Sequence, residues 1–255
     1  MKVCITGASL GIGKALTEYF IKKGDFVFGI SRKEGNLKKL KVKLGNNFTY
    51  QKCDVRNFDE VLHLKKKMDR LKFHPDVIIC CAGIFKNDIS PEFNINNYKE
   101  TFNINLIGTI NFIEVFLPDF LKKKNGQFIA LSSINAFRPN LKSISYPASK
   151  AALSMTFRGF DLVYREKGVY FSNIYLGPVD TSMWDGKKSF LVTDSKVIAK
   201  KIYKVTKTQK PVYFMPFFST FLFRVSWLIP DKLYSYISEK IIKNGNKKSY
   251  KILRK

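Results

Sequence analysis

The stretch that decides the fold is "TGASLGIG", Thr6 to Gly13. It follows a short apolar run, Lys2–Ile5, and opens an amphipathic segment, Gly11–Lys23, so the sequence predicts a strand, a glycine turn and a helix. The first glycine permits a tight turn, the second lets backbone approach a phosphate, and the third allows close helix packing. The spacing differs from Gly-x-Gly-x-x-Gly, but the helix N-terminus still offers free N–H groups to an anion.

Outward from this turn, apolar strand-like runs alternate with helix-like segments. Further strands are expected over Phe26–Ile30, Phe48–Lys52, Val77–Cys81, Gln127–Leu131, Val169–Tyr175 and Val212–Phe214. Helices are expected over Asp59–Leu71 with Asn57 as its cap, and over Tyr98–Lys123, Tyr146–Lys167 and Asp194–Thr206. This alternation implies right-handed crossovers. It predicts the α/β class: a single Rossmann-type doubly wound domain over residues 1–255, with a seven-stranded parallel sheet flanked by helices.

The charge of the chain is strongly positive. Forty-five Lys and Arg against twenty Asp and Glu leave +25, a field that attracts nucleic acid, anionic lipid or acidic carrier proteins. The lysines are scattered, however, and the abundance of Asn, Ile, Phe and Tyr is typical of AT-rich coding. Since no helix-turn-helix, zinc or RNA-binding signature accompanies the charge, we expect no specific nucleic-acid partner. Whether the charge is functional or coding bias stays open.

The four cysteines, Cys4, Cys53, Cys80 and Cys81, lack metal-site and redox-motif spacing and lie in apolar, strand-like stretches. They predict buried thiols, no metal and a cytoplasmic protein.

The end of the second strand, "FVFGISRKE", predicts the cofactor type. Sites for NAD usually have an acidic residue here that binds the ribose 2′-hydroxyl. This chain has Ser31, Arg32 and Lys33, whose charges suit a 2′-phosphate. We therefore expect NADP(H) rather than NAD(H). The alternative is that the two cations are ordinary surface residues. The missing acidic residue is therefore the stronger evidence for NADP(H).

A second motif is "SYPASK", in which Tyr146 lies four residues before Lys150. Pro147 suits the first turn of a helix, and positions four apart share a face, so the two side chains can reach one small volume. Taken alone, the pair is equally a surface tyrosine beside a surface lysine.

The motifs together resemble the short-chain dehydrogenase/reductase family, in its common type of roughly 250 residues, almost from end to end. The matching segments are Thr6–Gly13, Cys53-Asp54-Val55, Cys81-Ala82-Gly83, Asn105, Ser132-Ser133, Tyr146 with Lys150, and 177–181. Each motif is weak by itself, but their order and spacing are very specific. Two departures are Cys81, where the family usually has asparagine, and Leu176, where its loop commonly has proline.

The resemblance implies four catalytic residues: Asn105, Ser133, Tyr146 and Lys150. Tyr146 would donate the proton to the carbonyl oxygen in reduction. Lys150, the cationic nicotinamide of the oxidised cofactor and the nearby helix N-terminus would together favour the Tyr146 phenolate. Lys150 would also hold the nicotinamide ribose and connect through a water to Asn105. Ser133 would hydrogen-bond the substrate oxygen, and its thirteen-residue spacing from Tyr146 favours it over Ser132. Lowering a tyrosine pKa by about three units requires about 4 kcal/mol of preferential stabilisation of the anion.

The resemblance and the strand ends together give an expected set of cofactor-binding residues. They are Thr6, Gly7, Ser9, Gly11, Ile12, Gly13, Ser31, Arg32, Lys33, Asp54, Val55, Ala82, Gly83, Tyr146, Lys150, Gly177, Val179 and Thr181.

The C-terminal third of the chain is expected to form the substrate-binding part of the site. Residues 182–190 are expected to form a lid over the substrate, and residues 216–245 a hydrophobic and basic helical extension. The run from Val212 to Ile229 is nearly long enough to cross a bilayer, but Pro216 and Arg224 interrupt it, so we expect no membrane span. Three interpretations of the extension stay open: packing on its own domain or on a second subunit, a wall for a lipid-like substrate, or a peripheral anchor on the inner face of a membrane.

These observations predict an NADPH-dependent oxidoreductase that reduces a ketone, or oxidises the matching alcohol. The expected substrate is hydrophobic or acyl-type (3-oxoacyl-like), linked to an acyl carrier or to coenzyme A. A sugar or polyol reductase of the same family is one alternative, and a non-catalytic cofactor-sensing or nucleic-acid-binding protein is another. The resemblance also implies a homodimer or homotetramer.

Overall fold

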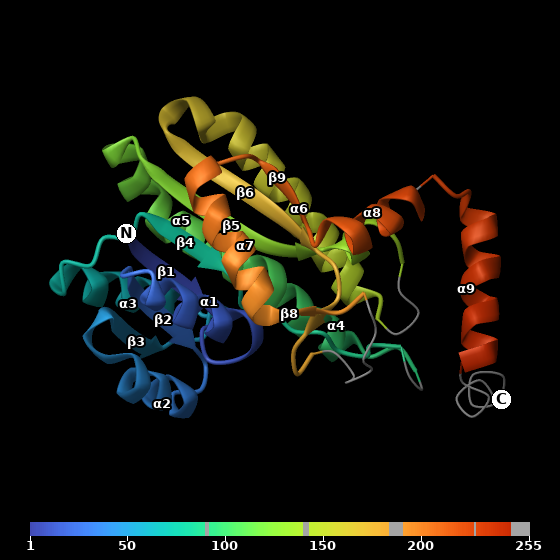
Figure 1. Cartoon of the computed structure of the whole chain (residues 1–255), viewed down its shortest axis with the longest axis horizontal. Coiled ribbons are helices and arrows are strands. Elements are labelled where there is room, and N and C mark those ends of the chain that lie inside the picture. Colours follow the sequence, from blue (N-terminus) through green and yellow to red (C-terminus); the bar gives the residue numbers. More distant parts are fainter. Residues whose placement is uncertain (90–91, 140–142, 184–190, 227, 246–255) are drawn as a thin grey trace.

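The computed structural model describes residues 1–89, 92–139, 143–183, 191–226 and 228–245. Its centre is a sheet of seven strands in the order β3-β2-β1-β4-β5-β6-β9, and all neighbours run parallel (Figure 1). The strands are β1 (Lys2–Thr6), β2 (Phe26–Ser31), β3 (Phe48–Lys52), β4 (Val77–Cys80), β5 (Gly126–Ser133), β6 (Val169–Leu176) and β9 (Val212–Met215). The predicted seven-stranded Rossmann-type sheet is confirmed.

Helices cover both faces of the sheet because the strands are apolar on both sides. Alternate residues of β1 belong to opposite cores: Val3 and Ile5 to one, Cys4 to the other. The first core is closed by α1 (Gly11–Lys22), α2 (Gly35–Leu44) and α7 (Ser195–Thr208), and α7 crosses in front of the sheet in Figure 1. The second is closed by α3 (Phe58–Arg70), α5 (Gly108–Lys123) and α6 (Ser145–Tyr164). The chain is therefore doubly wound.

The helix predicted over 98–123 is longer and interrupted. It consists of α4 (Ile95–Phe102), a π-helical turn η2 (Asn103–Ile107) and α5. Within the described residues, this is the one helical stretch long and apolar enough to cross a membrane by length and composition, and half of its most apolar window is buried inside the fold. We interpret it as a core helix. Local periodicity does not reveal the π turn, which widens the helix at Asn105.

Short elements complete the fold. They are the 3-10 turns η1 (Gly45–Asn47), η3 (Ile134–Phe137) and η4 (Arg165–Lys167), and a two-stranded pair, β7 (Val179–Asp180) with β8 (Thr193–Asp194). The predicted cap of α3 is present, since the Asn57 side chain accepts a hydrogen bond from the backbone N–H of Glu60.

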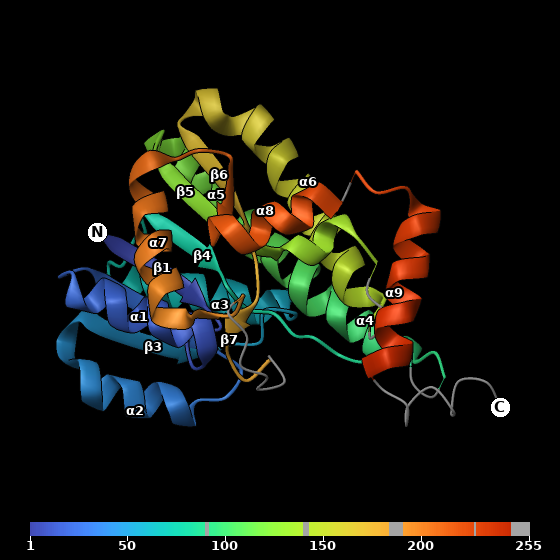
Figure 2. The same ribbon diagram turned by 45° about the vertical axis from the view of Figure 1, so that its right-hand side comes forward.

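The C-terminal stretch forms two helices, α8 (Phe217–Ser226) and α9 (Asp231–Gly245). Helix α8 packs on β9 and η3, whereas α9 stands at the side of the molecule (Figures 1 and 2). Arg138 ties the start of α9 to the loop after η3: it pairs with Asp231, and its guanidinium lies 4.8 Å from the ring centre of Tyr234. Most of the expected lid, residues 184–190, lies outside the described residues.

Candidate active site

The glycine turn sits between β1 and α1, where the strand order changes direction between β2 and β4. Gly7 and Gly11 have φ of +69° and +51°, a region that favours glycine. A Cβ on Gly13 would lie 2.1 Å from the carbonyl oxygen of Gly7, so the turn closes only with glycine there. Parallel sheets bind ligands outside the carboxyl ends of their strands at such a switch point.

Side chains around the turn leave the start of α1 open to an anion. Leu10, at the N-cap, makes no side-chain capping bond, and the first turn carries no acidic residue. Ser9 and Ser31 join the turn to the end of β2 through hydroxyls 2.8 Å apart. The side chain of Ile12 packs against the core, so this predicted residue offers only its backbone to a ligand. An uncapped helix start beside left-handed glycines fits the diphosphate of a dinucleotide.

The loop after β4 is fixed against the glycine turn by Thr6. Its hydroxyl accepts hydrogen bonds from the backbone N–H groups of Cys81 and Ala82, both at 3.0 Å. A Cβ on Gly83 would lie 3.3 Å from Asn105 Oδ1 and 3.6 Å from Lys150 Nζ. This loop therefore connects the predicted cofactor residues to two of the predicted catalytic residues. Cys81, the departure noted above, enters this network through its backbone.

Ser133, Tyr146 and Lys150 come together at the carboxyl end of β5. Tyr146 lies in the first turn of α6 and hydrogen-bonds the Ser133 side chain. The Lys150 ammonium lies 5.8 Å from the centre of the Tyr146 ring and donates a hydrogen bond of 2.7 Å to the carbonyl of Leu131. Phe85 covers the tyrosine ring edge-on at 5.2 Å. The predicted pair is therefore partly enclosed beside a serine, which argues against an ordinary surface pair.

Burial dominates the protonation of both residues. It raises the pKa of Tyr146, against a smaller lowering by the hydrogen bond with Ser133. It also lowers the pKa of Lys150 to about 8. The expected lowering relies on Lys150 together with the oxidised nicotinamide and the helix N-terminus, and it stays a prediction for the cofactor complex. In the chain alone, desolvation of the phenol dominates. Tyr146 is therefore a neutral phenol at physiological pH.

Asn105 lies in the π turn, and its side chain makes three hydrogen bonds. Its Oδ1 accepts from the N–H of Ile84 at 2.8 Å, while its Nδ2 donates to the carbonyl of Ile84 at 3.0 Å and to Ser149 at 3.1 Å. Asn105 thus holds the loop after β4 against α6.

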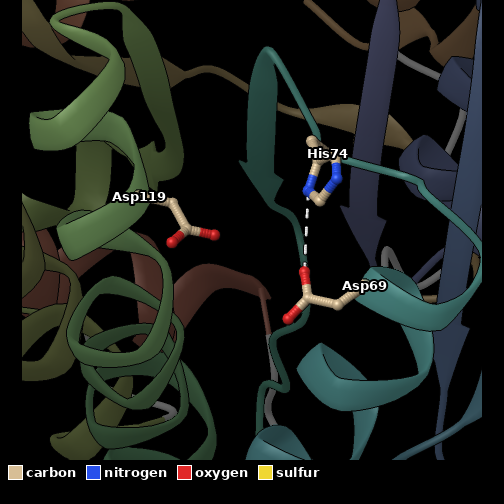
Figure 3. A group of neighbouring side chains, drawn as sticks. All are labelled: Asp69, His74 and Asp119. Carbon is tan, nitrogen blue, oxygen red and sulfur yellow. Dashed lines mark ion pairs between the residues drawn. The ribbon is translucent and has the colours of Figure 1, made fainter.

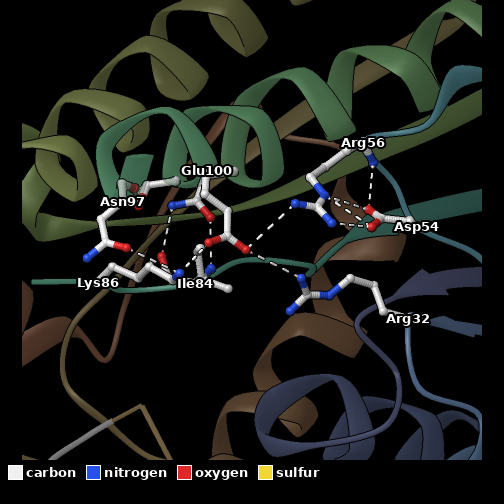
Figure 4. Close-up of polar contacts among 9 residues, drawn as sticks. Arg32, Asp54, Arg56, Ile84, Lys86, Asn97 and Glu100 are labelled. Carbon is white, nitrogen blue, oxygen red and sulfur yellow. Dashed lines mark hydrogen bonds and ion pairs between the residues drawn. The ribbon is translucent and has the colours of Figure 1, made fainter. Parts of the chain in front are cut away.

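An ionic cluster lies at the ends of β2 and β3 (Figure 4). Arg56 binds Asp54 with contacts of 2.6–3.0 Å, and Arg32 Nη1 lies 3.6 Å from Glu100 Oε1. Burial favours a higher pKa for Asp54, but the hydrogen bonds and charge of Arg56 outweigh it and the pKa is lowered. Glu100 also contacts Arg56 and Lys86. The sequence did not predict Arg56, Lys86 or Glu100 as site residues, although Arg56 directly follows the Asp54-Val55 motif.

The remaining predicted cofactor residues are placed as follows. Val55 is buried against Gly108, and its carbonyl accepts from Asn111 at 2.9 Å. The loop after β6 brings Thr181 to the glycine turn, since a Cβ on Gly11 would lie 3.3 Å from its Cγ2. Gly177 lies against Ser219, Val179 is buried in the first core, and the backbone of Lys33 contacts Ser31.

Comparison with known proteins places this architecture. The model of the short chain dehydrogenase family matches residues 1–191. The chain belongs to this family. It is an oxidoreductase that acts on CH–OH or carbonyl groups, within a fold that binds NAD(P).

Three matches illustrate the range of this short-chain dehydrogenase/reductase's relatives. An uncharacterized oxidoreductase of Staphylococcus epidermidis is 28% identical over 185 residues, 71% of this chain and 79% of that protein. The 3-oxoacyl-[acyl-carrier-protein] reductase of Buchnera aphidicola is 27% identical over 179 residues, 70% and 73%. The closed form of serine dehydrogenase with NADP+ superimposes with a TM-score of 0.78 at 19% identity, covering 84% of this chain and 94% of that one.

An apolar cavity of about 400 Å³ lies between the 3-10 turn η3, which follows Ser133, and helix α8. Its lining residues are Phe137, Phe214, Phe221, Arg224, Val225 and Leu228. Phe137 ends the 3-10 turn that Ser133 caps, and it packs on Tyr175 with ring centres 4.6 Å apart. The guanidinium of Arg224 lies 4.3 Å from the ring centre of Phe214. The cavity therefore combines aromatic walls with one cation.

Two aspartates and a histidine on the opposite side of the molecule give no support for a metal site. Asp69, His74 and Asp119 lie close together, and His74 pairs with Asp69 at 3.6 Å (Figure 3). Lys65 contacts both carboxylates, at 2.6 Å and 2.8 Å. One of the two negative charges of the group is thus already compensated by Lys65.

Proposed function

We propose that this enzyme is an NADPH-dependent reductase of a hydrophobic or acyl-type ketone, able to oxidise the matching alcohol. The observation that carries the proposal is the meeting of Ser133, Tyr146 and Lys150 beside the glycine turn and the loop after β4. A phenol, a hydroxyl and an ammonium converge there on one partly enclosed volume.

The protonation states favour reduction. Tyr146 keeps its proton at neutral pH because burial raises its pKa, so it can donate that proton to a carbonyl oxygen that gains charge. Ser133, hydrogen-bonded to Tyr146, would stabilise the same oxygen. Lys150 would hold a ribose hydroxyl and keep positive charge near the phenol, and Asn105 would hold the loop after β4 against α6.

The cofactor would lie along the carboxyl edge of the sheet. The glycine turn and the start of α1 would hold the diphosphate, Asp54 and Val55 the adenine, and the residues from Gly177 to Thr181 the nicotinamide end. Bound there, the nicotinamide supplies the hydride. Preference for NADP(H) is supported by the absence of an acid at the end of β2 and by the two cations, Arg32 and Lys33, that stand there.

The substrate proposal rests on the apolar cavity. It begins one 3-10 turn beyond Ser133, so a chain attached to the reacting carbonyl could lie among its aromatic walls. Similarity to a 3-oxoacyl-[acyl-carrier-protein] reductase supports an acyl substrate, and the charge of +25 suits an acidic carrier or coenzyme A. Sugar and polyol substrates would leave these walls without a partner.

We also propose a cytoplasmic homodimer or homotetramer. The four cysteines are free thiols, which supports a reducing compartment. Residues 182–190 remain the proposed lid. The packing of α8 on β9 and η3 supports the first interpretation for this helix, packing on its own domain. The residues that α8 contributes to the cavity also support the second, a wall for the substrate, and we propose no membrane contact.

The first experiment is a fluorescence titration with NADPH and NADH, followed by turnover with 3-oxoacyl thioesters of increasing chain length and with a sugar ketone. We expect tighter NADPH binding and a rise of kcat/KM with chain length. Tyr146→Phe should bind NADPH normally and lose turnover. Binding of neither cofactor, retained turnover in the variant, or preference for the sugar would each contradict the proposal.

A further inference from the structure

One carboxylate, that of Glu100, is shared by three cations from three different loops (Figure 4). Arg32 follows β2, Arg56 follows β3, and Lys86 follows β4. Glu100 Oε1 lies 3.6 Å from Arg32 Nη1 and 3.7 Å from Arg56 Nη1, and Oε2 accepts a hydrogen bond from Lys86. These loops meet at the carboxyl edge of the sheet, where the adenosine half of the cofactor is proposed to lie.

The cluster has more positive than negative charge. Arg32, Arg56 and Lys86 face two carboxylates, Asp54 and Glu100, and Lys33 adds a further cation next to Arg32. Hydrogen bonding and the charge of Lys86, with further contributions from the two arginines, lower the pKa of Glu100, so its carboxylate is ionised at neutral pH. The excess of cations can accommodate an additional anion.

The partners of Glu100 are held with different strength. Lys86 makes a hydrogen bond, whereas the two arginine contacts are too long for one. Arg56 is fixed by Asp54 instead. Arg32 is 46% exposed, and Glu100 is its one ion-pair partner among the described residues. Arg32 can therefore change partner at little energetic cost.

We propose that Glu100 determines cofactor specificity as an internal competitor of the 2′-phosphate of NADP(H) for Arg32. This inference rests on the proposed NADP(H) site. The phosphate, with two negative charges and oxygens suited to a bidentate guanidinium contact, replaces Glu100 as the partner of Arg32. Glu100 stays with Lys86, and its charge opposes the phosphate.

The opposite role, in which Glu100 positions Arg32 for the phosphate, is disfavoured by the same geometry. A contact of 3.6 Å without a hydrogen bond, at a half-exposed guanidinium, fixes orientation weakly. Repulsion between the carboxylate and a doubly charged phosphate acts over longer distances and does not depend on orientation. Removing the charge should therefore tighten binding.

The test compares Glu100→Gln with Glu34→Gln. Glu34 lies two residues from Arg32 but pairs with Lys38 at 3.5 Å, so its variant removes an equal charge without a contact to Arg32. The dissociation constants of NADPH and NADH are measured by fluorescence titration at fixed salt. We expect Glu100→Gln to bind NADPH about fivefold more tightly, or about 1 kcal/mol. Its NADH affinity should change less than about twofold, and Glu34→Gln should match the wild type.

A second arm isolates the phosphate. Thermal stabilisation by adenosine 2′,5′-bisphosphate, which lacks the nicotinamide, should increase in Glu100→Gln, and the increase should disappear when Arg32→Gln is added. Should Glu100→Gln not fold, Glu100→Ala removes the same carboxylate and must act in the same direction. Unchanged or weaker NADPH binding in the folded variant overturns the inference while leaving the enzyme an NADPH reductase. A wild-type preference for NADH instead overturns the proposed cofactor itself.

Discussion

Lys150 carries a charge that works against folding. The side chain is 6% exposed, and burial lowers its pKa from 10.5 to about 8. Each pKa unit corresponds to about 1.4 kcal/mol, so the buried ammonium destabilises the folded chain by about 3 kcal/mol at pH 7. Between pH 8 and 10.5 the unfolded chain keeps a proton that the folded chain has released. Stability should therefore rise with pH in this window, by about 2 kcal/mol from pH 7 to 9.5.

The assay is urea unfolding of the wild type and of Lys150→Met at pH 7 and pH 9.5. The variant loses the hydrogen bond to the carbonyl of Leu131, which lowers its stability at both pH values alike. Burial raises the pKa values of Cys80 and Cys81 to about 12 in the wild type, and their titration is largely common to both proteins. The wild type should gain about 2 kcal/mol more than the variant over this range. Parallel pH profiles would refute the reasoning, because Lys150 would then not be desolvated.

Three further outcomes are expected. Gly13→Ala should lower the free energy of unfolding by about 2–4 kcal/mol in urea, because its Cβ would lie 2.1 Å from a carbonyl oxygen. The control, Gly159→Ala, has nothing within 4 Å of the added Cβ and should raise it by about 0.5–1 kcal/mol. Equal effects of the two variants would contradict the close approach at Gly13. Thr6→Val leaves two N–H groups without an acceptor and should lower the free energy of unfolding by about 1–3 kcal/mol in the same assay, and a neutral result would mean that water replaces the hydroxyl. Arg138→Ala should release the start of α9 and speed limited proteolysis there, while the thermal unfolding midpoint of the domain stays the same. An unchanged cleavage rate would show that other contacts hold the helix.

The sequence by itself determined the sheet and the place of the site. Alternating apolar runs predicted seven parallel strands, and local rules were sufficient because strand period, glycine turns and caps depend on neighbouring residues. The resemblance to the short-chain dehydrogenase/reductase family supplied Ser133, Tyr146 and Lys150 as candidates, because their order and spacing match the motifs of that family.

Only the tertiary structure decided the energetics and the contacts between loops. The direction of the Tyr146 pKa shift in the chain alone depends on how much solvent the fold removes, and burial raises that pKa. The π turn at Asn105 and the cavity under α8 likewise depend on packing. Glu100 lies 68 residues from Arg32 and 44 from Arg56 in the sequence, and no local pattern links them. The fold brings these charges together because it places three separate loops at one edge of one sheet.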